Sequence, residues 1–395
     1  MRIVVCSLTY PLPNGVSSSV NESVDGFVKA GHDVVIISPD YGVGQARPEH
    51  RPVTSSVLAR AVVRFIGKKE RMFGISSKAE IEAIINDFGP DAFWLHTITW
   101  ASNTFERIML SSDKAKILTY HTMLDMYGRL YAGAVGEQRM IARSRKVANA
   151  VDRVITPSHY MEGRLHGYGV TKPIDVIATG ITKPAHYIGK GEFKRRYQIR
   201  SDHDVLMYVG RVVKEKNIEA LLNALKLVLK EHRHTTLVLV GPGDIEETMA
   251  QANEMGIADH VRCTGQLSLS QAKTCYSAAD LFVFTSQSET QGLVVGEAMI
   301  VGLPVVALVS PIQPEIYPAG TAFLANNVTE LASQIVRALG NEELREHIAQ
   351  TGKEFVSANF TKEIMIQKQL RTFEQAIADN AAAPAPVKKV FANIL

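Results

Sequence analysis

The sequence predicts an α/β protein of two doubly wound domains, each built on a parallel β-sheet. At 395 residues the chain is long for one α/β domain and sufficient for two that each bury a core. Short runs rich in valine and isoleucine recur along the chain, and their continuous apolar character is typical of strands covered on both faces. Segments of helical periodicity separate these runs, which indicates consecutive β–α–β units.

The expected strands fall into two groups, one in each half of the chain. The N-terminal group is Arg2–Leu8, Asp33–Ser38, Ala92–His96, Lys116–His121, Arg153–Ser158 and Asp175–Gly180. The C-terminal group is Asp204–Gly210, Thr235–Gly241, Val261–Gly265, Leu281–Ser286 and Pro304–Val309. Between the first two strands of the C-terminal group, Glu215–Lys230 is the clearest helix, because its apolar residues recur three and four positions apart.

A polar, basic segment without a strand, near residues 183–203, separates the two halves. We therefore expect an N-terminal domain over residues 1–183 and a C-terminal domain over residues 184–360. A last helical pattern, residues 361–380, is expected to pack back on the N-terminal domain. The Ala/Pro-rich segment 381–395 is expected to form a flexible tail.

The composition excludes several classes of protein. Lys and Arg number 43 against 40 Asp and Glu, and this balance does not by itself indicate a nucleic-acid partner. Three cysteines without a C-x-x-C motif argue against a disulfide framework or a zinc site, and they fit a reducing cytosol. The apolar stretch Gly292–Val309 contains Glu297 and Pro304, so we interpret it as a buried helix followed by a buried strand rather than a membrane span.

Basic residues and glycines follow the strands of the C-terminal half, where open parallel sheets bind ligands. The segment GRVVKEKN places Arg211 and Lys216 beside a helix N-terminus, an arrangement that suits a diphosphate. A solvated basic loop would have the same pattern. The segment GPGD follows the next strand, and Gly241 there would let the backbone approach a ligand closely.

Two glutamates, Glu289 and Glu297, lie eight residues apart after the strand Leu281–Ser286. Glu297 falls within an apolar helix start, where an unpaired carboxylate would cost on the order of several kcal/mol. It therefore needs partners. Ribose hydroxyls of a bound nucleotide and an internal partner both satisfy that requirement.

These segments together resemble the retaining glycosyltransferases of family 4, and the resemblance covers almost the whole chain. Its most specific part is the E-x7-E motif, Glu289-TQGLVVG-Glu297, between DLFVFTS and GLPVVA. The resemblance implies the GT-B fold, in which two Rossmann-like domains have parallel sheets facing a central cleft. It also implies that Arg211 and Lys216 neutralise the donor diphosphate.

The same resemblance implies the remaining contacts to the donor. Glu297 would hold the ribose hydroxyls and Glu289 the hydroxyls of the transferred sugar. Gly292 and Leu293 would offer backbone amides. Gly15, before the first helix, resembles the family's glycine loop, which faces the donor phosphates from across the cleft, although many members carry two glycines where this chain has Asn14-Gly15.

Two histidines end neighbouring strands of the N-terminal half. His121, in the segment YHT, matches the family's active-site histidine near the reacting sugar. His96 is a second candidate, expected on the acceptor side, and a purely structural role is also compatible with its position.

The expected chemistry needs no metal and no cofactor. Departure of the nucleoside diphosphate builds charge on its β-phosphate, and Arg211 and Lys216 would stabilise that charge in place of a metal. Asp202 and Asp204 have D-x-D spacing, but they precede a strand at the wrong end of the sheet and are interpreted as a loop. The resemblance implies retention of anomeric configuration. No residue stands out as a covalent nucleophile, so we expect front-face attack by the acceptor on the donor sugar. We expect the donor to be a UDP-sugar in preference to a GDP-sugar.

Two basic segments favour a lipid acceptor. The first is a predicted amphipathic helix over Val57–Phe73, in which one face is apolar and the basic residues are Arg60, Arg64, Lys68, Lys69 and Arg71. The second is Arg139–Lys146. A basic face beside an apolar one is typical of proteins that bind anionic membranes, although a solvated face packed on its own domain has the same pattern.

The segments YHTMLDMYGRLY and VIATGI resemble the diacylglycerol glucosyltransferase branch of the family. This resemblance implies transfer of a hexose to a lipid such as diacylglycerol, with Tyr127 on the acceptor side and the protein peripheral on the cytoplasmic face of a membrane. An enzyme for a soluble or polysaccharide acceptor is the alternative. The sequence indicates neither the sugar nor the oligomeric state.

A non-catalytic, nucleotide-binding regulatory protein is the alternative from another class. The joint presence of His121, Glu289, Glu297, Arg211 and Lys216 argues against it. A dehydrogenase is disfavoured because no G-x-G-x-x-G follows the first strand. A nucleic-acid-binding protein is disfavoured because the chain lacks both net charge and a recognised module.

Overall fold

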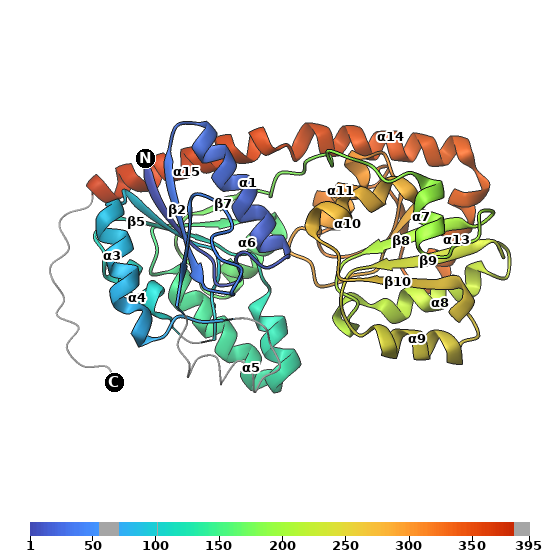
Figure 1. Ribbon diagram of the computed structural model, residues 1–395, viewed down its shortest axis with the longest axis horizontal. Coiled ribbons are helices and arrows are strands. Elements are labelled where there is room, and N and C mark those ends of the chain that lie inside the picture. Colours follow the sequence, from blue (N-terminus) through green and yellow to red (C-terminus); the bar gives the residue numbers. More distant parts are fainter. Residues whose placement is uncertain (55–70, 101, 383–395) are drawn as a thin grey trace.

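The computed structural model describes residues 1–54, 71–100 and 102–382, which form two α/β domains side by side (Figure 1). The N-terminal domain is built on a parallel sheet whose described strands have the order β3-β2-β1-β4-β5-β6-β7. These strands are β1 (Arg2–Cys6), β2 (Asp33–Pro39), β3 (His50–Val53), β4 (Ala92–Leu95), β5 (Ala115–Thr119), β6 (Arg153–Thr156) and β7 (Ile174–Val176).

The C-terminal domain has a second parallel sheet, of order β10-β9-β8-β11-β12-β13. Its strands are β8 (Asp204–Val209), β9 (Thr235–Val240), β10 (Val261–Gly265), β11 (Leu281–Phe284), β12 (Val305–Leu308) and β13 (Phe323–Ala325). The predicted fold class is therefore confirmed: both halves carry a doubly wound parallel sheet.

Helices cover both faces of each sheet. Those packed around the N-terminal sheet are α1 (Gly15–Lys29), α3 (Lys78–Phe88), α4 (Thr104–Ser111), α5 (Leu124–Ala148) and α6 (His159–Gly167). The C-terminal domain carries α7 (Lys190–Arg196), α8 (Ile218–Val228), α9 (Ile245–Glu254), α10 (Leu269–Cys275), α11 (Leu293–Ile300), α12 (Gln313–Ile316), α13 (Val328–Gly340) and α14 (Glu342–Asn359). The last helix, α15 (Lys362–Ala382), also packs on the N-terminal sheet.

Successive residues of each strand enter cores on opposite faces of the sheet. In β1, Val4 and Cys6 belong to one buried cluster and Ile3 and Val5 to another. Because both faces are covered, every buried position of the strand, Ile3 to Cys6, is apolar, and this is why the strands appear as continuous runs in the sequence.

All eleven predicted strands form, and two further strands were missed. The missed strands, β3 and β13, lie at sheet edges and are four and three residues long, too short for a distinct apolar run. The segment expected to be only a linker contains α7. The predicted helix Glu215–Lys230 begins later, at Ile218, because Asn217 takes a left-handed conformation with φ 58° after a 3₁₀ turn.

The last helix returns to the first domain. In Figure 1, α14 and α15 run along one side of the molecule from the C-terminal domain to the N-terminal domain, where α15 packs against α1 and β5. Phe373 anchors α15 through edge-to-face contacts with Phe27 and Trp94, at ring-centroid distances of 5.2 and 4.9 Å. The two domains are thereby linked twice, through the segment before β8 and through α15.

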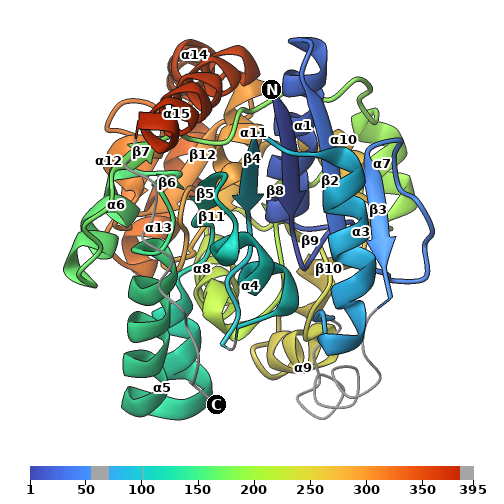
Figure 2. The same cartoon turned by 90° about the vertical axis from the view of Figure 1, so that its left-hand side faces the viewer.

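Helix α5 is folded into a hairpin of two helical segments. Its backbone leaves the helical conformation at Ala132 and Gly133, and Gly133 has φ 60°. Gly128 and Gly136 bring the segments so close that a Cβ on either would clash with the carbonyl of the other. Figure 2 shows the two segments side by side, projecting from the N-terminal domain. Among the described residues, no helix is long and apolar enough to cross a membrane.

Candidate active site

The two basic residues after β8 lie at the carboxyl end of the sheet, beside the start of α8. Arg211 forms an ion pair with Glu215 and donates a 2.8 Å hydrogen bond to the hydroxyl of Tyr127, which belongs to the other domain. Tyr127 in turn donates to Glu215 at 3.2 Å. Burial raises the pKa of Tyr127 to about 12, so its hydroxyl stays protonated at neutral pH. The guanidinium is therefore held at the domain boundary by groups from both domains.

Lys216 contacts the first glutamate of the E-x7-E motif. Its Nζ lies 2.7 Å from Oε1 of Glu289, and the two side chains are 13% and 22% exposed. Glu289 precedes Gly292, the left-handed N-cap residue of α11 with φ 71°, and Leu293 is the first residue of that helix. The free amides at the start of α11 therefore lie close in sequence to this ion pair and favour an anionic ligand.

Glu297, the second glutamate of the motif, lies on α11 and has internal partners. Tyr276 donates a 2.8 Å hydrogen bond to its Oε2, and Nζ of Lys273 lies 3.5 Å from Oε1. Burial raises the pKa of Glu297, and Lys273 opposes the rise. The Glu297 side chain is 17% exposed.

The two histidines come together at the ends of β4 and β5. Nδ1 of His96 lies 2.9 Å from Nε2 of His121, and the rings stack at 17°. Burial lowers the pKa of His121 to about 4 and that of His96 well below its usual value, so both rings are neutral at pH 7. His121 adjoins the motif directly, because its carbonyl accepts a 3.0 Å hydrogen bond from Thr290.

The acceptor-side prediction for His96 needs correction. Its side chain is 2% exposed and lies behind His121, and its Nε2 has no hydrogen-bond partner among the described residues. A buried ring cannot reach an acceptor. Its position beside His121 instead fits a positioning residue that holds the tautomer and orientation of the His121 ring.

Gly15 and Gly241 differ in what their small size permits. Gly15 begins α1 after Asn14, whose side chain caps the helix, and a Cβ there would lie 3.6 Å from Leu293. The N-termini of α1 and α11 therefore face each other across the domain boundary. Gly241 has φ 144° and packs directly against the carbonyl of Gly210, so its close approach is to the neighbouring backbone.

The E-x7-E segment is attached to the N-terminal domain at several points. Ser158 donates a 2.7 Å hydrogen bond to the carbonyl of Thr290. Gln291 exchanges two hydrogen bonds with the backbone of Thr179, at 2.8 and 2.9 Å. Glu315 accepts two further hydrogen bonds, from the amides of His159 and Tyr160 at the start of α6.

The predicted membrane-binding helix falls mostly outside the described residues. Arg60, Arg64, Lys68 and Lys69 lie there. Arg71 is described, in a non-helical segment, and its guanidinium bonds the carbonyl of Asp40 and lies 5.4 Å from the ring centroid of Tyr41. Arg71 therefore packs on its own domain and is not part of a helical basic face.

The sequence did not reveal the residues that form ion pairs and hydrogen bonds with the predicted site residues. These are Glu215, Lys273, Tyr276, Gln291 and Glu315, which pair with Arg211, Glu297 or the opposite domain. For Lys273 and Tyr276 the sequence offers only a helical pattern and no sign of which face meets α11.

Two family models together match most of the chain. The model described as Glycosyltransferase Family 4 matches residues 13–183, and the model described as Glycosyl transferases group 1 matches residues 189–355. The first match falls within the N-terminal domain, and the second covers most of the C-terminal domain with its donor-side residues.

Two curated relatives are similar over most of their length. The alpha-monoglucosyldiacylglycerol synthase of Streptococcus pneumoniae is 29% identical over 383 residues, which are 92% of this chain and 84% of that protein. The GDP-mannose-dependent alpha-mannosyltransferase of Mycolicibacterium smegmatis is 25% identical over 78% of this chain and 79% of that protein.

A solved structure shares the whole fold. Anabaena HepE in complex with UDP-glucose superposes with a TM-score of 0.77 over 95% of this chain and all of that one, at 17% identity. The two family models, the E-x7-E segment and the two parallel sheets all indicate the same family and the same fold. The chain therefore belongs to the family 4 glycosyltransferases and has the GT-B fold.

Proposed function

We propose that this glycosyltransferase transfers a hexose from a UDP-sugar to a lipid acceptor such as diacylglycerol, with retention of configuration and without a metal ion. The reaction would take place with the protein bound peripherally on the cytoplasmic, anionic face of a membrane. The relative from Streptococcus pneumoniae is named for the synthesis of a monoglucosyldiacylglycerol, and this supports the lipid acceptor. The UDP-glucose complex of HepE supports a UDP-sugar as the donor. Because one relative is named as GDP-mannose-dependent, GDP-sugars are the other class of donor to test.

The observation that carries the lipid acceptor is the exposed tip of the α5 hairpin. Leu130, Tyr131 and Val135 lie at its bend and are 60%, 63% and 63% exposed. Apolar side chains gathered on a projecting element are typical of surfaces that enter a partner or a membrane. Arg129, 74% exposed, and Arg139, also exposed, lie on the same hairpin and would attract anionic headgroups.

The hairpin also reaches the donor side of the site. Tyr127 stands one helical turn before Tyr131 and stacks on it at 6.5 Å, and its hydroxyl contacts Arg211 and Glu215. A lipid surface at the hairpin tip would therefore lie close to the residues assigned to the diphosphate. This continuity favours an acceptor that is drawn from a membrane over one that diffuses in from solution.

The proposed chemistry uses the charges at the two strand ends. Arg211 and Lys216 would stabilise the negative charge that develops on the departing diphosphate. Donor binding would release Lys216 from Glu289, whose carboxylate would then accept hydrogen bonds from the sugar. His121, neutral at pH 7 with a pKa of about 4, would lie beside the reacting sugar as a hydrogen-bonding group and not as a cation. The acceptor hydroxyl would attack from the face that the diphosphate leaves and would pass its proton to an oxygen of the departing diphosphate.

The first experiment measures turnover with a panel of UDP- and GDP-sugars, with and without diacylglycerol in anionic vesicles, in the presence and absence of EDTA. Glycolipid formed despite EDTA, and lost in Glu289→Ala, is the expected result. Release of the nucleoside diphosphate that does not depend on lipid would point to a soluble acceptor. Tight nucleotide binding without turnover of any donor would contradict the proposal and favour a regulatory protein.

The second experiment tests the hairpin. The double variant Leu130→Ser, Val135→Ser is expected to lose most co-sedimentation with anionic vesicles and to raise the apparent KM for diacylglycerol while leaving nucleotide affinity unchanged. Val28→Ser is the matched control, since Val28 is 41% exposed near the C-terminal end of α1, at the opposite edge of the sheet. Equal vesicle binding by the hairpin variant and the control would exclude the hairpin as the membrane contact.

A further inference from the structure

Three histidines lie in a row at the edge of the C-terminal sheet opposite the donor side. His203, His234 and His260 each immediately precede a strand, β8, β9 and β10, and these strands are neighbours in the sheet. Parallel pairing therefore brings the three rings to the same edge. His203 lies 5.6 Å from His234 and 5.5 Å from His260, measured between ring centroids. None of these histidines belongs to the site described above.

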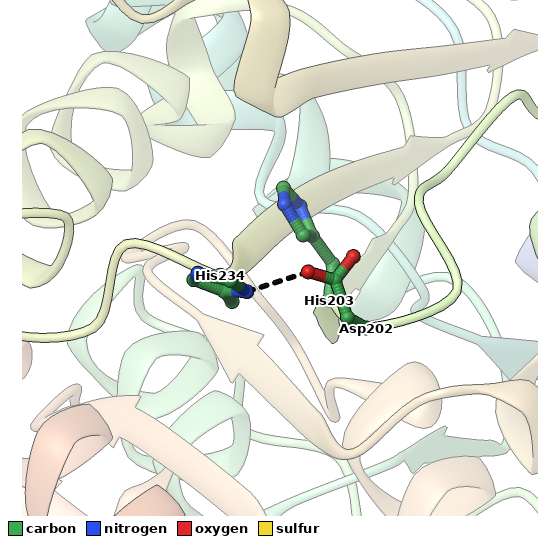
Figure 3. Close-up of side chains that lie close together, drawn as sticks. All are labelled: Asp202, His203 and His234. Carbon is green, nitrogen blue, oxygen red and sulfur yellow. Dashed lines mark ion pairs between the residues drawn. The ribbon is translucent and has the colours of Figure 1, made fainter.

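We propose that Asp202, His203 and His234 bind a divalent transition-metal ion, of which Zn²⁺ is the representative. One carboxylate oxygen and one nitrogen of each ring all lie within 4.8 Å of one another. Figure 3 shows the three side chains, with the ion pair of Asp202 and His234 as a dashed line. The atoms of that pair, Oδ2 of Asp202 and Nδ1 of His234, are 2.7 Å apart.

Small side-chain movements would complete the coordination. Zinc–ligand bonds of about 2.0–2.2 Å place two ligands of a tetrahedral ion roughly 3.4 Å apart. Ligand atoms up to 4.8 Å apart must therefore approach one another by about 1.4 Å at most, and the Asp202–His234 pair, now 2.7 Å apart, must separate by about 0.7 Å. Asp202 and His234 have side chains that are 44% and 63% exposed, so both can rotate without disturbing the core.

His203 provides the rigid part of the proposed site. Its side chain is 5% exposed, and its Nδ1 lies 2.8 Å from the hydroxyl oxygen of Thr236. The ring also stacks on His260 at an angle of 9°, and Nδ1 of His260 bonds the carbonyl of Thr235. Fixed partners of this kind orient histidine ligands in known metal sites. Burial lowers the pKa of His203, which favours the neutral ring that a metal requires.

One competing cation faces the site. Arg200 contacts both carboxylate oxygens of Asp202 at 3.3 Å, and its side chain is 70% exposed. An exposed ion pair of this length contributes little to stability, so an incoming metal can displace the guanidinium.

The ligand set selects a class of ion and a role. Two imidazoles and one carboxylate suit Zn²⁺, Cu²⁺ or Ni²⁺, whereas Mg²⁺ and Ca²⁺ prefer oxygen ligands alone. The site lies at the amino ends of β8 and β9, and Arg211 follows the carboxyl end of β8. A metal here would not reach the donor diphosphate. It would tie the segment that enters the C-terminal domain to the turn before β9 and so stabilise this domain.

The test is a calorimetric titration of the EDTA-treated, dialysed full chain with ZnCl₂ and separately with MgCl₂. One zinc site with a dissociation constant in the micromolar range or tighter is expected, together with a higher midpoint of thermal unfolding and no comparable effect of magnesium. His234→Ala and Asp202→Asn should each weaken binding at least about tenfold. Both residues are exposed, so neither variant should impair folding.

His232→Ala is the matched control, because it removes a neighbouring histidine that is not one of the three proposed ligands. Co²⁺ provides a second readout: absorption typical of tetrahedral nitrogen and oxygen ligation, without a thiolate band, excludes binding by a cysteine. Zinc affinity unchanged in His234→Ala and Asp202→Asn, equal loss in His232→Ala, or a thiolate band would each overturn the proposal. Transferase activity is read separately, and its sensitivity to EDTA bears only on the proposed function.

Discussion

Lys216 and Glu289 neutralise each other in the structure, and this pairing has a consequence for catalysis. Both side chains are only partly exposed, so either charge would be poorly solvated alone. A nucleotide-sugar donor would offer its diphosphate to Lys216 and its sugar hydroxyls to Glu289. In the proposed mechanism, the ion pair would neutralise both charges before the donor binds, and each residue would exchange its partner for a donor contact when the donor binds.

Removing the ammonium group of Lys216 should weaken transition-state stabilisation more than substrate binding. We expect Lys216→Ala to lower kcat by about 10²–10³-fold, since a preorganised group that stabilises developing charge contributes that much. Lys214→Ala is the matched control, because Lys214 is exposed on the same 3₁₀ turn. Steady-state kinetics with the preferred donor measure both variants. A kcat in Lys216→Ala that matches the control would remove Lys216 from the catalytic set.

Buried neutral histidines make stability depend on pH. His50 is 1% exposed and bonded to the hydroxyl of Ser38 at 2.7 Å, and burial lowers its pKa to about 4. In the unfolded chain its pKa is near 6.5, so between pH 6.5 and 4 the unfolded state binds the extra proton. The contribution of this neutral ring to stability is therefore present above pH 6.5 and is lost as the pH falls through that interval.

The expected loss from His50 alone is about 3 kcal/mol of unfolding free energy between pH 7 and pH 4. Urea unfolding at a series of pH values measures it. His50→Gln should flatten the pH dependence relative to the unaltered chain, and the slope that remains comes from the other groups with shifted pKa values, His96, His121 and His203 among them. Identical slopes in the two proteins would show that His50 does not titrate as argued.

At the scale of the elements, the position of the Arg211 segment depends on how closely the segments after β8 and β9 approach each other. The chain leaves β8 at Gly210 and β9 at Gly241, and the segments beyond them stay in contact through a bridge between Val212 and Gly243. This contact directs the Arg211 segment toward α8. Gly241 is therefore required by the neighbouring backbone, at a φ of 144° that other residues avoid.

We expect Gly241→Ala to destabilise the protein by about 3 kcal/mol or more, because backbone strain adds to a clash with the Gly210 carbonyl. Gly256→Ala separates the two effects. Gly256 also has positive φ, 71°, but nothing lies within 4 Å of the added Cβ, so the cost should be about 1–2 kcal/mol. Chemical denaturation compares them, and equal losses would contradict the proposed close approach.

At the scale of the whole molecule, contacts from the C-terminal domain hold the two domains together. Glu315 caps the first turn of α6, with its oxygens 2.7 and 2.9 Å from two amides. It also lines a recess of about 290 Å³ between the domains, together with Phe360 and Met365. A carboxylate at a helix N-terminus is stabilising, and here it belongs to the opposite domain.

Glu315→Ala should shift the protein toward a more open arrangement, because hydrogen bonds to a charged group contribute about 1.5–3 kcal/mol each. We expect a larger radius of gyration in solution scattering and a KM for the donor raised by about tenfold, with partial rescue by Glu315→Gln. Glu346→Ala, an exposed change on α14, is the control. Scattering curves that coincide for the two alanine variants would mean that the cap does not hold the domains together.

The fold and the positions of the donor-side residues could be predicted from the sequence. Strands covered on both faces leave continuous apolar runs, and parallel order places the residue after each run at one edge of the sheet. Arg211, His121 and Glu289 were found in this way, since each follows its strand within a few residues. Helix α15 was predicted because its pattern is long and periodic. All of these features are encoded by residues that are close together in the sequence.

Only the tertiary structure decided which groups meet. The partners of Glu297, the burial of His96 behind His121, the fold of α5 into a hairpin and the cap by Glu315 all depend on how helices and domains pack. Edge strands β3 and β13 likewise form only because a neighbouring strand offers hydrogen bonds. A local pattern specifies the element and its buried face. The partner across that face is set by the packing of residues that lie far apart along the chain.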